Sequence, residues 1–431
     1  MNRRHFLGAV AFSAFADSSP KVNGTRLRER LEALSVFGRP TGGTFADGVS
    51  RVAYSDADIA GRKYVMGLIE AAGLHPKIDA AGNISAVRAG SDPSLPPVLF
   101  GSHIDSVPNG GNFDGDLGSL AAIEAVQTLK EAGVTTRRPL EVVIWCNEEG
   151  VAYNNGVYGS RAASGHLDPG ELDQVWNGVK KSDAIRKVGG DPDRIASAVR
   201  KPGSFHAYIE LHIEQGGNLD KAGIPVGVVE GIVGIDRYEV EIKGFANHAG
   251  TTPMPERHDA LLAASYLTIA VNEVVRAEPG RQVGTVGQIA VTPNAPNVVP
   301  GVVRLTVELR DLSPTKLTKL STQIRARIEE IAARTQTQVQ MRPAAHHAEA
   351  LATPEVQASI EAVCPKLGLK TMRLPSGAGH DAQMMATLGP MGMIFIPSVK
   401  GISHAPQEFS RWEDCTRGAQ VLLDTVLHWA A

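Results

Sequence analysis

The fold class follows from the stretch PPVLFGSHIDSV, residues 96–107, in which an apolar run of strand length breaks off into glycine and polar residues. A helical pattern, GSLAAIEAVQTLKEAGV, follows at 118–134, and a second apolar run, PLEVVIWCNEEG, lies at 139–150. Short apolar runs that alternate with helices are typical of buried strands in an α/β sheet. Ligands bind at the carboxyl ends of such strands, where the polar residues of both runs fall. The sequence therefore predicts an α/β fold with a functional site at this edge.

The pattern changes from about residue 229. Strand-like alternation and helical periodicity then take turns in four segments, at 237–250, 258–277, 301–312 and 314–335. This order predicts a smaller α+β domain over residues 229–338 that is inserted into the first domain. The first domain would then comprise residues 17–228 and 339–431.

The composition excludes several classes of protein. A net charge of -3 gives no basic footprint for nucleic acid. No uninterrupted apolar run reaches the roughly 20 residues that a membrane span needs. The cysteines are only three (Cys146, Cys364 and Cys415), which excludes a dense disulfide framework. We expect a globular protein without a nucleic-acid partner.

The first 16 residues differ from the rest of the chain. Arg3 and Arg4 precede a short uncharged segment that ends in Ala14-Phe15-Ala16. A basic start, an apolar segment and an A-x-A site are typical of a secretory signal, and the adjacent arginines resemble the twin-arginine signal for folded proteins. Residues 1–16 therefore predict export to the periplasm after assembly in the cytoplasm. The alternative is a cytoplasmic protein with an arginine-rich N-terminus.

Histidines and carboxylates gather beside glycines at the predicted strand and loop ends. The candidates are His103, Asp105, Asp114, Glu148, Glu149, His212 and His404. Nitrogen and oxygen ligands suit divalent ions such as zinc, and Asp105 is spaced to hold the second ring nitrogen of His103. Taken singly, a paired acid is usually solvated and a lone histidine usually packed. Their joint placement favours a metal site.

Eight ordered motifs carry a family resemblance. They are GSHIDSVPNGGNFDGDLG, NEEG with GSRAASG following, ELHIEQG, NHAGTTPM, PNVVPG, ELRD, SGAGHDA and SHAPQE. In this order, from about residue 25 to the C-terminus, the chain resembles the N-carbamoyl-L-amino-acid hydrolases. These group with allantoate amidohydrolases and β-ureidopropionases in the aminoacylase-like metallopeptidase superfamily.

The resemblance implies two divalent metal ions per subunit, zinc or else manganese, cobalt or nickel. His103 and His212 would bind one ion, and Glu149 and His404 the other. Asp114 would bridge the two ions, and Glu148 would be the general base toward the attacking water.

The resemblance also implies a substrate with a carboxylate, which Arg310 would bind through its guanidinium. The alternative for Arg310 is a salt bridge to Glu308 or Asp311 on a solvated strand. The other implied substrate-binding residues are Gln215, Asn297, Gly379 and His380.

The inserted domain of this family forms the homodimer and closes as a lid over the catalytic domain. His248 would stabilise the oxyanion at the site of the other subunit. The chain departs from the family at Val151-Ala152-Tyr153, where relatives often have Ser-Arg-Phe, so that one cation near the metals is missing.

The expected reaction is removal of the carbamoyl group from N-carbamoyl L-amino acids, giving amino acid, carbon dioxide and ammonia. An allantoate or related ureide amidohydrolase is the nearest alternative, followed by a peptidase or N-acyl amino-acid hydrolase. A non-catalytic binding protein is disfavoured, because both Glu148 and Asp114 are present.

Overall fold

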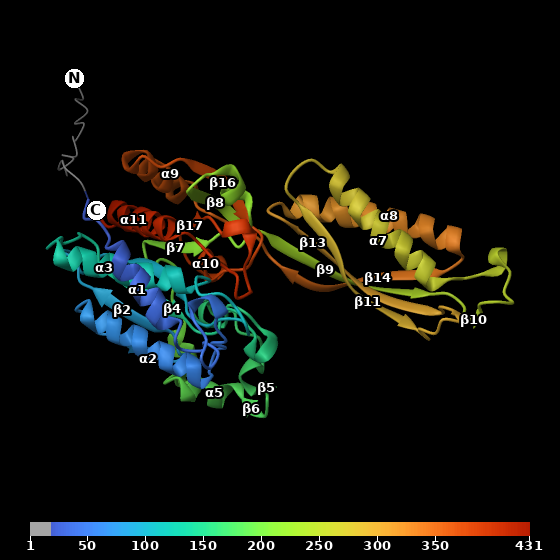
Figure 1. Cartoon of the computed structure of the whole chain (residues 1–431), viewed down its shortest axis with the longest axis horizontal. Helices are drawn as coiled ribbons and strands as arrows, with labels where there is room; N and C mark the ends of the chain where they lie inside the picture. Colours follow the sequence, from blue (N-terminus) through green and yellow to red (C-terminus); the bar gives the residue numbers. More distant parts are fainter. Residues whose placement is uncertain (1–18) are drawn as a thin grey trace, which may run out of the picture.

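The computed structural model describes residues 19–431, and the predicted export signal at 1–16 lies outside them. Two units are joined side by side (Figure 1). One is built on a large mixed sheet covered by helices, and the other on a small antiparallel sheet. The predicted α/β fold with an inserted α+β domain is confirmed.

The large sheet has nine strands in the order β1-β2-β4-β3-β7-β17-β8-β15, with β16 paired to β8. Its central pairs β4/β3, β3/β7 and β7/β17 are parallel, whereas β2 and β15 pair antiparallel with their neighbours. The strands are β1 (Lys77–Ile78), β2 (Ile84–Arg88), β3 (Val98–His103), β4 (Leu140–Trp145), β7 (Ala207–Ile213), β8 (Val226–Ile232), β15 (Ala350–Leu351), β16 (Thr371–Ser376) and β17 (Met391–Ile396).

Both faces of this sheet are buried. Phe100 of β3 packs into a core beneath one set of helices, while the adjacent Leu99 packs into a second core on the opposite face. Burial on both faces explains why β3 and β4 read as continuous apolar runs rather than alternating ones. The long helices are α1 (Gly24–Leu34), α2 (Asp56–Ala71), α3 (Asp116–Glu131), α9 (Pro354–Val363) and α11 (Trp412–Trp429).

Local sequence sets the helix ends. The Ser55 side chain accepts a hydrogen bond from the Asp58 backbone N–H and so caps α2, which is followed by Gly73 at a positive φ of 86°. Most residues of α3 are buried, because this helix lies between β3 and α11. The shorter elements are α4 (Tyr158–Ser164), α5 (Lys181–Lys187), α6 (Asn218–Ala222), α10 (Asp381–Met385), β5 (Val175–Trp176) and β6 (Val179–Lys180).

The inserted unit is a four-stranded antiparallel sheet in the order β11-β13-β9-β14, with two helices on one face. Val303, Leu305 and Val307 of β13 point into the core under the helices, as strict alternation predicts. Its elements are β9 (Gly234–Lys243), β10 (Asn247–His248), α7 (Ala260–Ala277), β11 (Val283–Thr292), β12 (Val298–Val299), β13 (Val302–Asp311), α8 (Pro314–Thr335) and β14 (Gln338–His347).

The change of sheet lies a few residues later than the expected boundaries of 229 and 338. Strand β8 stays in the large sheet up to Ile232, and β14 pairs with β9 from Gln338 to His347. The inserted unit therefore spans about residues 234–347. Strand β14 contains Pro343, and its pairing with β9 shifts register after this residue, so its sequence does not alternate regularly.

Within residues 19–431, α7 is the one helix with the length and mean hydropathy of a membrane span. Its face with Ala263, Leu267 and Val271 packs against the small sheet. This packing is typical of a core helix.

Candidate metal centre

Three parallel strands bring the candidate ligands to one edge of the large sheet. Strand β3 ends at His103, which is in register with Trp145, the last residue of β4, and β4 runs on into Glu148 and Glu149. His212 lies near the end of β7, on the other side of β3. Side chains from segments far apart in the chain therefore converge at the carboxyl ends of the strands, as expected for an open α/β sheet.

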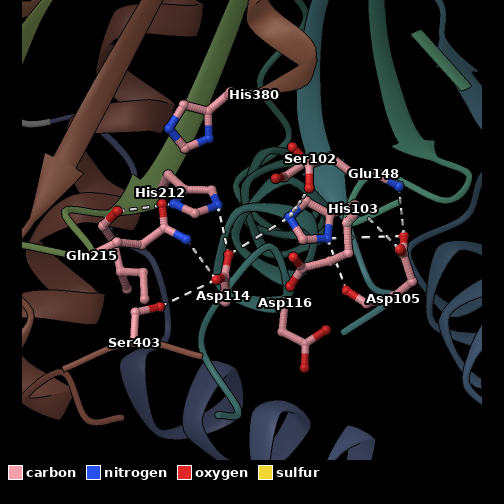
Figure 2. A network of polar contacts seen from close by, with 12 residues as sticks. Ser102, His103, Asp105, Asp114, Asp116, Glu148, His212, Gln215, His380 and Ser403 are labelled. Carbon is pink, nitrogen blue, oxygen red and sulfur yellow. Dashed lines mark hydrogen bonds and ion pairs between the residues drawn. The ribbon is translucent and has the colours of Figure 1, made fainter. Parts of the chain in front are cut away.

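A first group of ligand atoms consists of His103, Asp114 and His212, all buried. The Asp114 Oδ1 atom lies 3.0 Å from His212 Nε2 and 3.7 Å from His103 Nε2 (Figure 2). The Nδ1 atom of His212 contacts the backbone oxygen of Ile213 at 2.9 Å, which leaves Nε2 to face Asp114. This orientation is the usual one for a histidine that ligates a metal.

A second group shares Asp114 and adds Glu149 and His404. The His404 Nε2 atom lies 3.2 Å from Asp114 Oδ2 and 3.4 Å from Glu149 Oε2. The two oxygens of Asp114 thus face different groups of candidate ligands.

The donor set fits divalent cations. Two polar atoms here, His212 Nε2 and Glu149 Oε1, are buried without a hydrogen-bond partner within the described part of the chain. His212 Nε2 lies 3.0 Å from Asp114 Oδ1, as an ion pair rather than a hydrogen bond. Imidazole nitrogens and carboxylate oxygens are ligands of zinc, manganese and related ions.

Glu148 lies beside the first group. Its Oε2 atom is 3.6 Å from His103 Nε2, and the side chain is nearly buried. The backbone N–H groups of Glu148 and Glu149 donate to Asp105 Oδ1 and Oδ2 at 3.1 and 3.2 Å. One carboxylate therefore orients the whole acidic pair.

The role expected for Asp105 differs from the one observed. Its backbone oxygen, at 2.9 Å, is the group that contacts His103 Nδ1, while its carboxylate lies 3.9 Å away. The side chain turns instead toward the Glu148–Glu149 backbone, because two N–H donors there satisfy both of its oxygens. The His-x-Asp spacing alone does not distinguish these two contacts.

The three carboxylates of the cluster differ in their pKa shifts. Burial raises the pKa of Glu148 well above its usual value, and neighbouring carboxylates add to this rise. Burial also raises the pKa of Glu149 well above its usual value, with a further contribution from Asp114. Burial would raise the pKa of Asp114 as well, but contacts with His212 and His404 hold it well below the usual range.

The two histidines of the first group differ. Burial lowers the pKa of His103 to about 4. Burial would also lower the pKa of His212, but the close contact with the Asp114 carboxylate, together with the charge of Glu210, raises it to about 9. A divalent ion would replace the proton that balances this charge.

Two of the residues expected to bind substrate contact the metal cluster. Gln215, at a positive φ of 57°, donates from Nε2 to Asp114 Oδ2 at 2.7 Å. His380 lies against His212, with ring centroids 4.5 Å apart, and its Nε2 atom is 2.8 Å from Ser376 Oγ. Burial and the neighbouring His212 lower the pKa of His380 well below its usual value. Gly379 precedes it in the same loop.

Three other expected residues lie on the inserted unit, at its two ends. His248 on β10 and Asn297 lie at the end farthest from the large sheet, where the Asn297 oxygen accepts from the Ala249 backbone N–H at 2.9 Å (Figure 1). Arg310 lies at the opposite end, and its Nη1 atom donates to the Gly377 oxygen at 2.6 Å. His248 therefore does not reach the metal cluster of its own chain in this conformation.

Arg310 also forms the salt bridge that was its alternative role. Its guanidinium contacts Glu308 Oε1 at 2.7 Å, and Arg237 pairs with the other oxygen of Glu308. The contact with Gly377 places Arg310 next to the loop that carries His380. It is thus held between the two units.

Sequence reasoning missed Glu408, the last residue of the SHAPQE motif. Its Oε1 atom accepts hydrogen bonds from the backbone N–H groups of Phe113 and Asp114 at 3.0 and 3.1 Å, and its Oε2 atom accepts from Ser403 Oγ at 2.7 Å. It joins the loop of His404 to Asp114, which both ligand groups share. Its position inside the SHAPQE motif was the sequence feature that could have identified it.

The unusual Val151-Ala152-Tyr153 segment turns away from solvent. Tyr153 has a positive φ of 68° and packs its ring 5.9 Å from Tyr54 and 6.0 Å from Trp176. The buried ammonium of Lys181 lies 5.5 Å from the same ring. This segment therefore forms part of an aromatic cluster.

Comparison with known proteins agrees with this geometry. Residues 99–428 match peptidase family M20/M25/M40. The chain is 42% identical to an N-carbamoyl-L-amino acid amidohydrolase of Geobacillus stearothermophilus, over 94% of this chain and 98% of the relative. It is 36% identical to a ureidoglycolate hydrolase of Arabidopsis thaliana, over 94% and 86%. A hydantoinase/carbamoylase family amidase from Burkholderia ambifaria superposes with a TM-score of 0.88 at 34% identity, covering 96% of this chain and 99% of that one.

Proposed function

Because this chain belongs to peptidase family M20/M25/M40, we propose that it is a metal-dependent amidohydrolase that acts on N-carbamoyl L-amino acids. The products are the amino acid, carbon dioxide and ammonia. The observation that carries the proposal is the pair of ligand groups that share Asp114, with Glu148 beside them. Amidohydrolases named for this substrate class, 35–42% identical over nearly the full chain, support the choice of substrate.

Two divalent ions would be held by His103, Asp114 and His212 and by Asp114, Glu149 and His404. When bound, such ions polarise the substrate carbonyl and acidify the attacking water. Glu148 holds the proton in transit: its carboxylate takes a proton from the water and passes it to the leaving nitrogen. Its burial suits this task, since a desolvated carboxylate binds a proton more tightly than an exposed one.

The substrate carboxylate binds to Arg310. The guanidinium lies at the junction of the two units, next to the loop with His380, and already holds a carboxylate, that of Glu308. Two charge-assisted hydrogen bonds from one planar group fix the carboxylate in a single orientation. Gln215, Asn297 and Gly379 complete the proposed substrate contacts.

The site is completed by a second subunit. His248 is exposed at the far end of the inserted unit, so its proposed role toward the oxyanion requires the partner chain of a homodimer and lid closure. Glu148→Gln and His248→Ala chains, each inactive alone, should regain about a quarter of wild-type activity when mixed dimers form. A mixture that stays inactive would show that the two residues do not act across subunits.

A ureide substrate is the second candidate. Relatives named ureidoglycolate hydrolase, 34–36% identical to this chain, favour it. Both candidates share the metal cluster and differ in the pocket for the rest of the substrate. The reaction is the same cleavage of a carbon–nitrogen bond.

Ammonia release from a substrate panel distinguishes the candidates. The metal-loaded protein would be given N-carbamoyl L- and D-amino acids, N-carbamoyl-β-alanine, allantoate, ureidoglycolate and N-acetyl amino acids, with Glu148→Gln as the blank. We expect turnover of the N-carbamoyl L-amino acids. Hydrolysis of an N-acetyl amino acid releases acetate and the amino acid but no ammonia, so free amino acid is measured beside ammonia. Turnover of a ureide alone would select the second candidate, and turnover of N-acetyl amino acids alone would contradict both.

We also propose that residues 1–16 direct export of the folded protein to the periplasm. The adjacent Arg3 and Arg4 and the A-x-A site support this proposal. Replacing both arginines with lysine in a host with the twin-arginine pathway should retain the protein in the cytoplasm. Arg28→Lys on the exposed face of α1 is the control, and an unchanged distribution of the double variant would contradict export.

A further inference from the structure

Arg51 is a fully buried cation that no motif singles out. It lies in the loop between α1 and α2, and its side chain has no exposed surface. Its guanidinium donates to the backbone oxygens of Ile104, Leu34 and Phe37 at 2.6, 3.1 and 2.9 Å, and it pairs with the Asp116 carboxylate. A buried charge is costly unless it is paired and hydrogen-bonded, and here four acceptors surround it.

Two of these acceptors lie in the loops that carry metal ligands. Ile104 stands between His103 and Asp105, and its oxygen faces the guanidinium. Asp116 lies two residues after Asp114, and its backbone N–H donates to the Asp114 oxygen at 2.7 Å. One side chain therefore joins the loop after β3 to the start of α3 (Figure 2 shows both loops).

The backbone of Arg51 adds to this link. Its N–H donates to Ser106 Oγ at 2.9 Å, and its oxygen accepts from the Ser106 N–H at 3.0 Å. The acceptors Leu34 and Phe37, at the end of α1, fix the opposite side of the guanidinium. Gly61 of α2 packs so closely that an added Cβ would lie 2.9 Å from Arg51 Cδ. The guanidinium is thus held by its acceptors, and the stem packs closely against Gly61.

We propose that Arg51 is a positioning residue for the metal centre. Arg51 holds Ile104, the residue after His103, and Asp116, two residues after Asp114. These contacts set the separation of His103 and Asp114 before an ion is bound. Arg51 reaches the ligands only through the Ile104 oxygen and Asp116, so its effect on an incoming cation is geometric. Glu408 joins the loop of His404 to the backbone of Asp114, so Asp114 is supported by Glu408 as well as by Arg51 through Asp116.

This role differs from a merely structural one in what it affects. A structural arginine contributes to the free energy of unfolding, whereas a positioning residue also changes metal affinity in the folded protein. Outer groups that orient metal ligands typically contribute about 10- to 100-fold in affinity. Lysine keeps the charge but donates from a single point, and it cannot reach four acceptors spread around a planar group.

Arg30 provides a matched control. It is likewise a buried arginine in an ion pair, with Glu124 at 3.1 Å, but its partners belong to α3 away from the ligand loops. Arg30→Lys therefore removes guanidinium contacts of the same kind without touching the metal centre. We expect both variants to lower the unfolding midpoint of the metal-free protein.

The test is metal affinity of Arg51→Lys, Arg30→Lys and the wild type, measured by competition with a chromophoric chelator using zinc. We expect Arg51→Lys to bind at least about tenfold more weakly and Arg30→Lys to bind as the wild type does. The visible spectrum of the cobalt-loaded protein should change in Arg51→Lys alone. Asp116→Asn, which keeps an acceptor, serves if Arg51→Lys does not fold, and its affinity should fall in the same direction.

Equal affinities of the folded Arg51→Lys variant and the wild type would overturn the proposal, as would an equal loss in Arg30→Lys. The role of Arg51 rests on the metal centre of the proposed function, but different results contradict the two proposals. A wild-type protein that binds no zinc would contradict the proposed function itself. A wild type that binds zinc no better than Arg51→Lys contradicts only the role of Arg51.

Discussion

Binding of the ion at His103, Asp114 and His212 should release one proton at neutral pH. Asp114 and Glu210 raise the pKa of His212 to about 9, so this imidazole is mostly protonated at pH 7.5 in the metal-free protein. A histidine must be neutral to ligate a metal. The pKa of His103 is about 4, so this residue contributes no proton at that pH.

The magnitude follows from the difference between pH and pKa. Deprotonating His212 at pH 7.5 costs about 2 kcal/mol, which weakens apparent affinity about 30-fold relative to pH values above 9. Below pH 8 the affinity should fall about tenfold for each unit of pH. Because the pKa of His212 is raised to about 9, a proton competes with the metal ion for this imidazole at lower pH.

The assay uses His404→Ala, in which only the first group remains complete. Calorimetric titration with zinc at pH 7.5, in buffers that differ in ionisation enthalpy, counts the protons released. We expect about one, falling toward half near pH 9, and Glu210→Gln should shift that fall to lower pH because it removes a charge that raises the His212 pKa. Release of no proton would refute the assignment of a protonated His212 beside Asp114.

Three further perturbations test other parts of the account. Arg310→Met should raise KM about 10- to 100-fold with little change in kcat, because it removes charge-assisted hydrogen bonds to the substrate, whereas Arg304→Met on the same sheet should leave KM unchanged. Burial raises the pKa of Asp58 to about 6, so the folded protein binds the proton of this carboxyl more tightly than the unfolded chain does. The free energy of unfolding should therefore fall as pH rises from about 4 to 6. Asp58→Asn should remove about 3 kcal/mol of this fall in denaturant titrations. Gly115→Ala should abolish tight zinc binding, since φ is 66° and an added Cβ would lie 2.3 Å from the His103 imidazole. Gly133→Ala is the control: φ is 65° with no neighbour within 4 Å, so this variant should lower the unfolding midpoint and still bind zinc.

Much of the fold could be predicted from local pattern. The apolar runs that form β3 and β4 are long enough for strands, and the polar residues that follow them mark the carboxyl ends. Strand β14 was harder, because Pro343 and a register shift interrupt its alternation. Its pairing with β9 is a contact between segments about a hundred residues apart, which local periodicity does not encode.

The candidate site was likewise predictable from the sequence only in part. Residue type and position at strand and loop ends were enough to single out His103, Asp114 and His212 as candidates. The contact of Gln215 with Asp114 was not foreseen, because it depends on a left-handed backbone at Gln215. Arg51 was also missed, since a buried arginine has no sequence signature when its acceptors are backbone oxygens.

The position of His248 shows a further limit of sequence reasoning. Its motif indicates a functional residue, but only the structure shows that it lies at the far end of the inserted unit (Figure 1). Distances between units depend on domain orientation, which the local pattern does not determine.

The central claim is a pair of ions that share Asp114, with Glu148 as the proton carrier. Metal-free protein should be titrated with zinc while bound metal and ammonia release from an N-carbamoyl L-amino acid are followed together. The account predicts that activity reaches its maximum at two ions per chain, and that Glu148→Gln binds two ions without turnover. Full activity at one ion per chain, or turnover by Glu148→Gln, would contradict it.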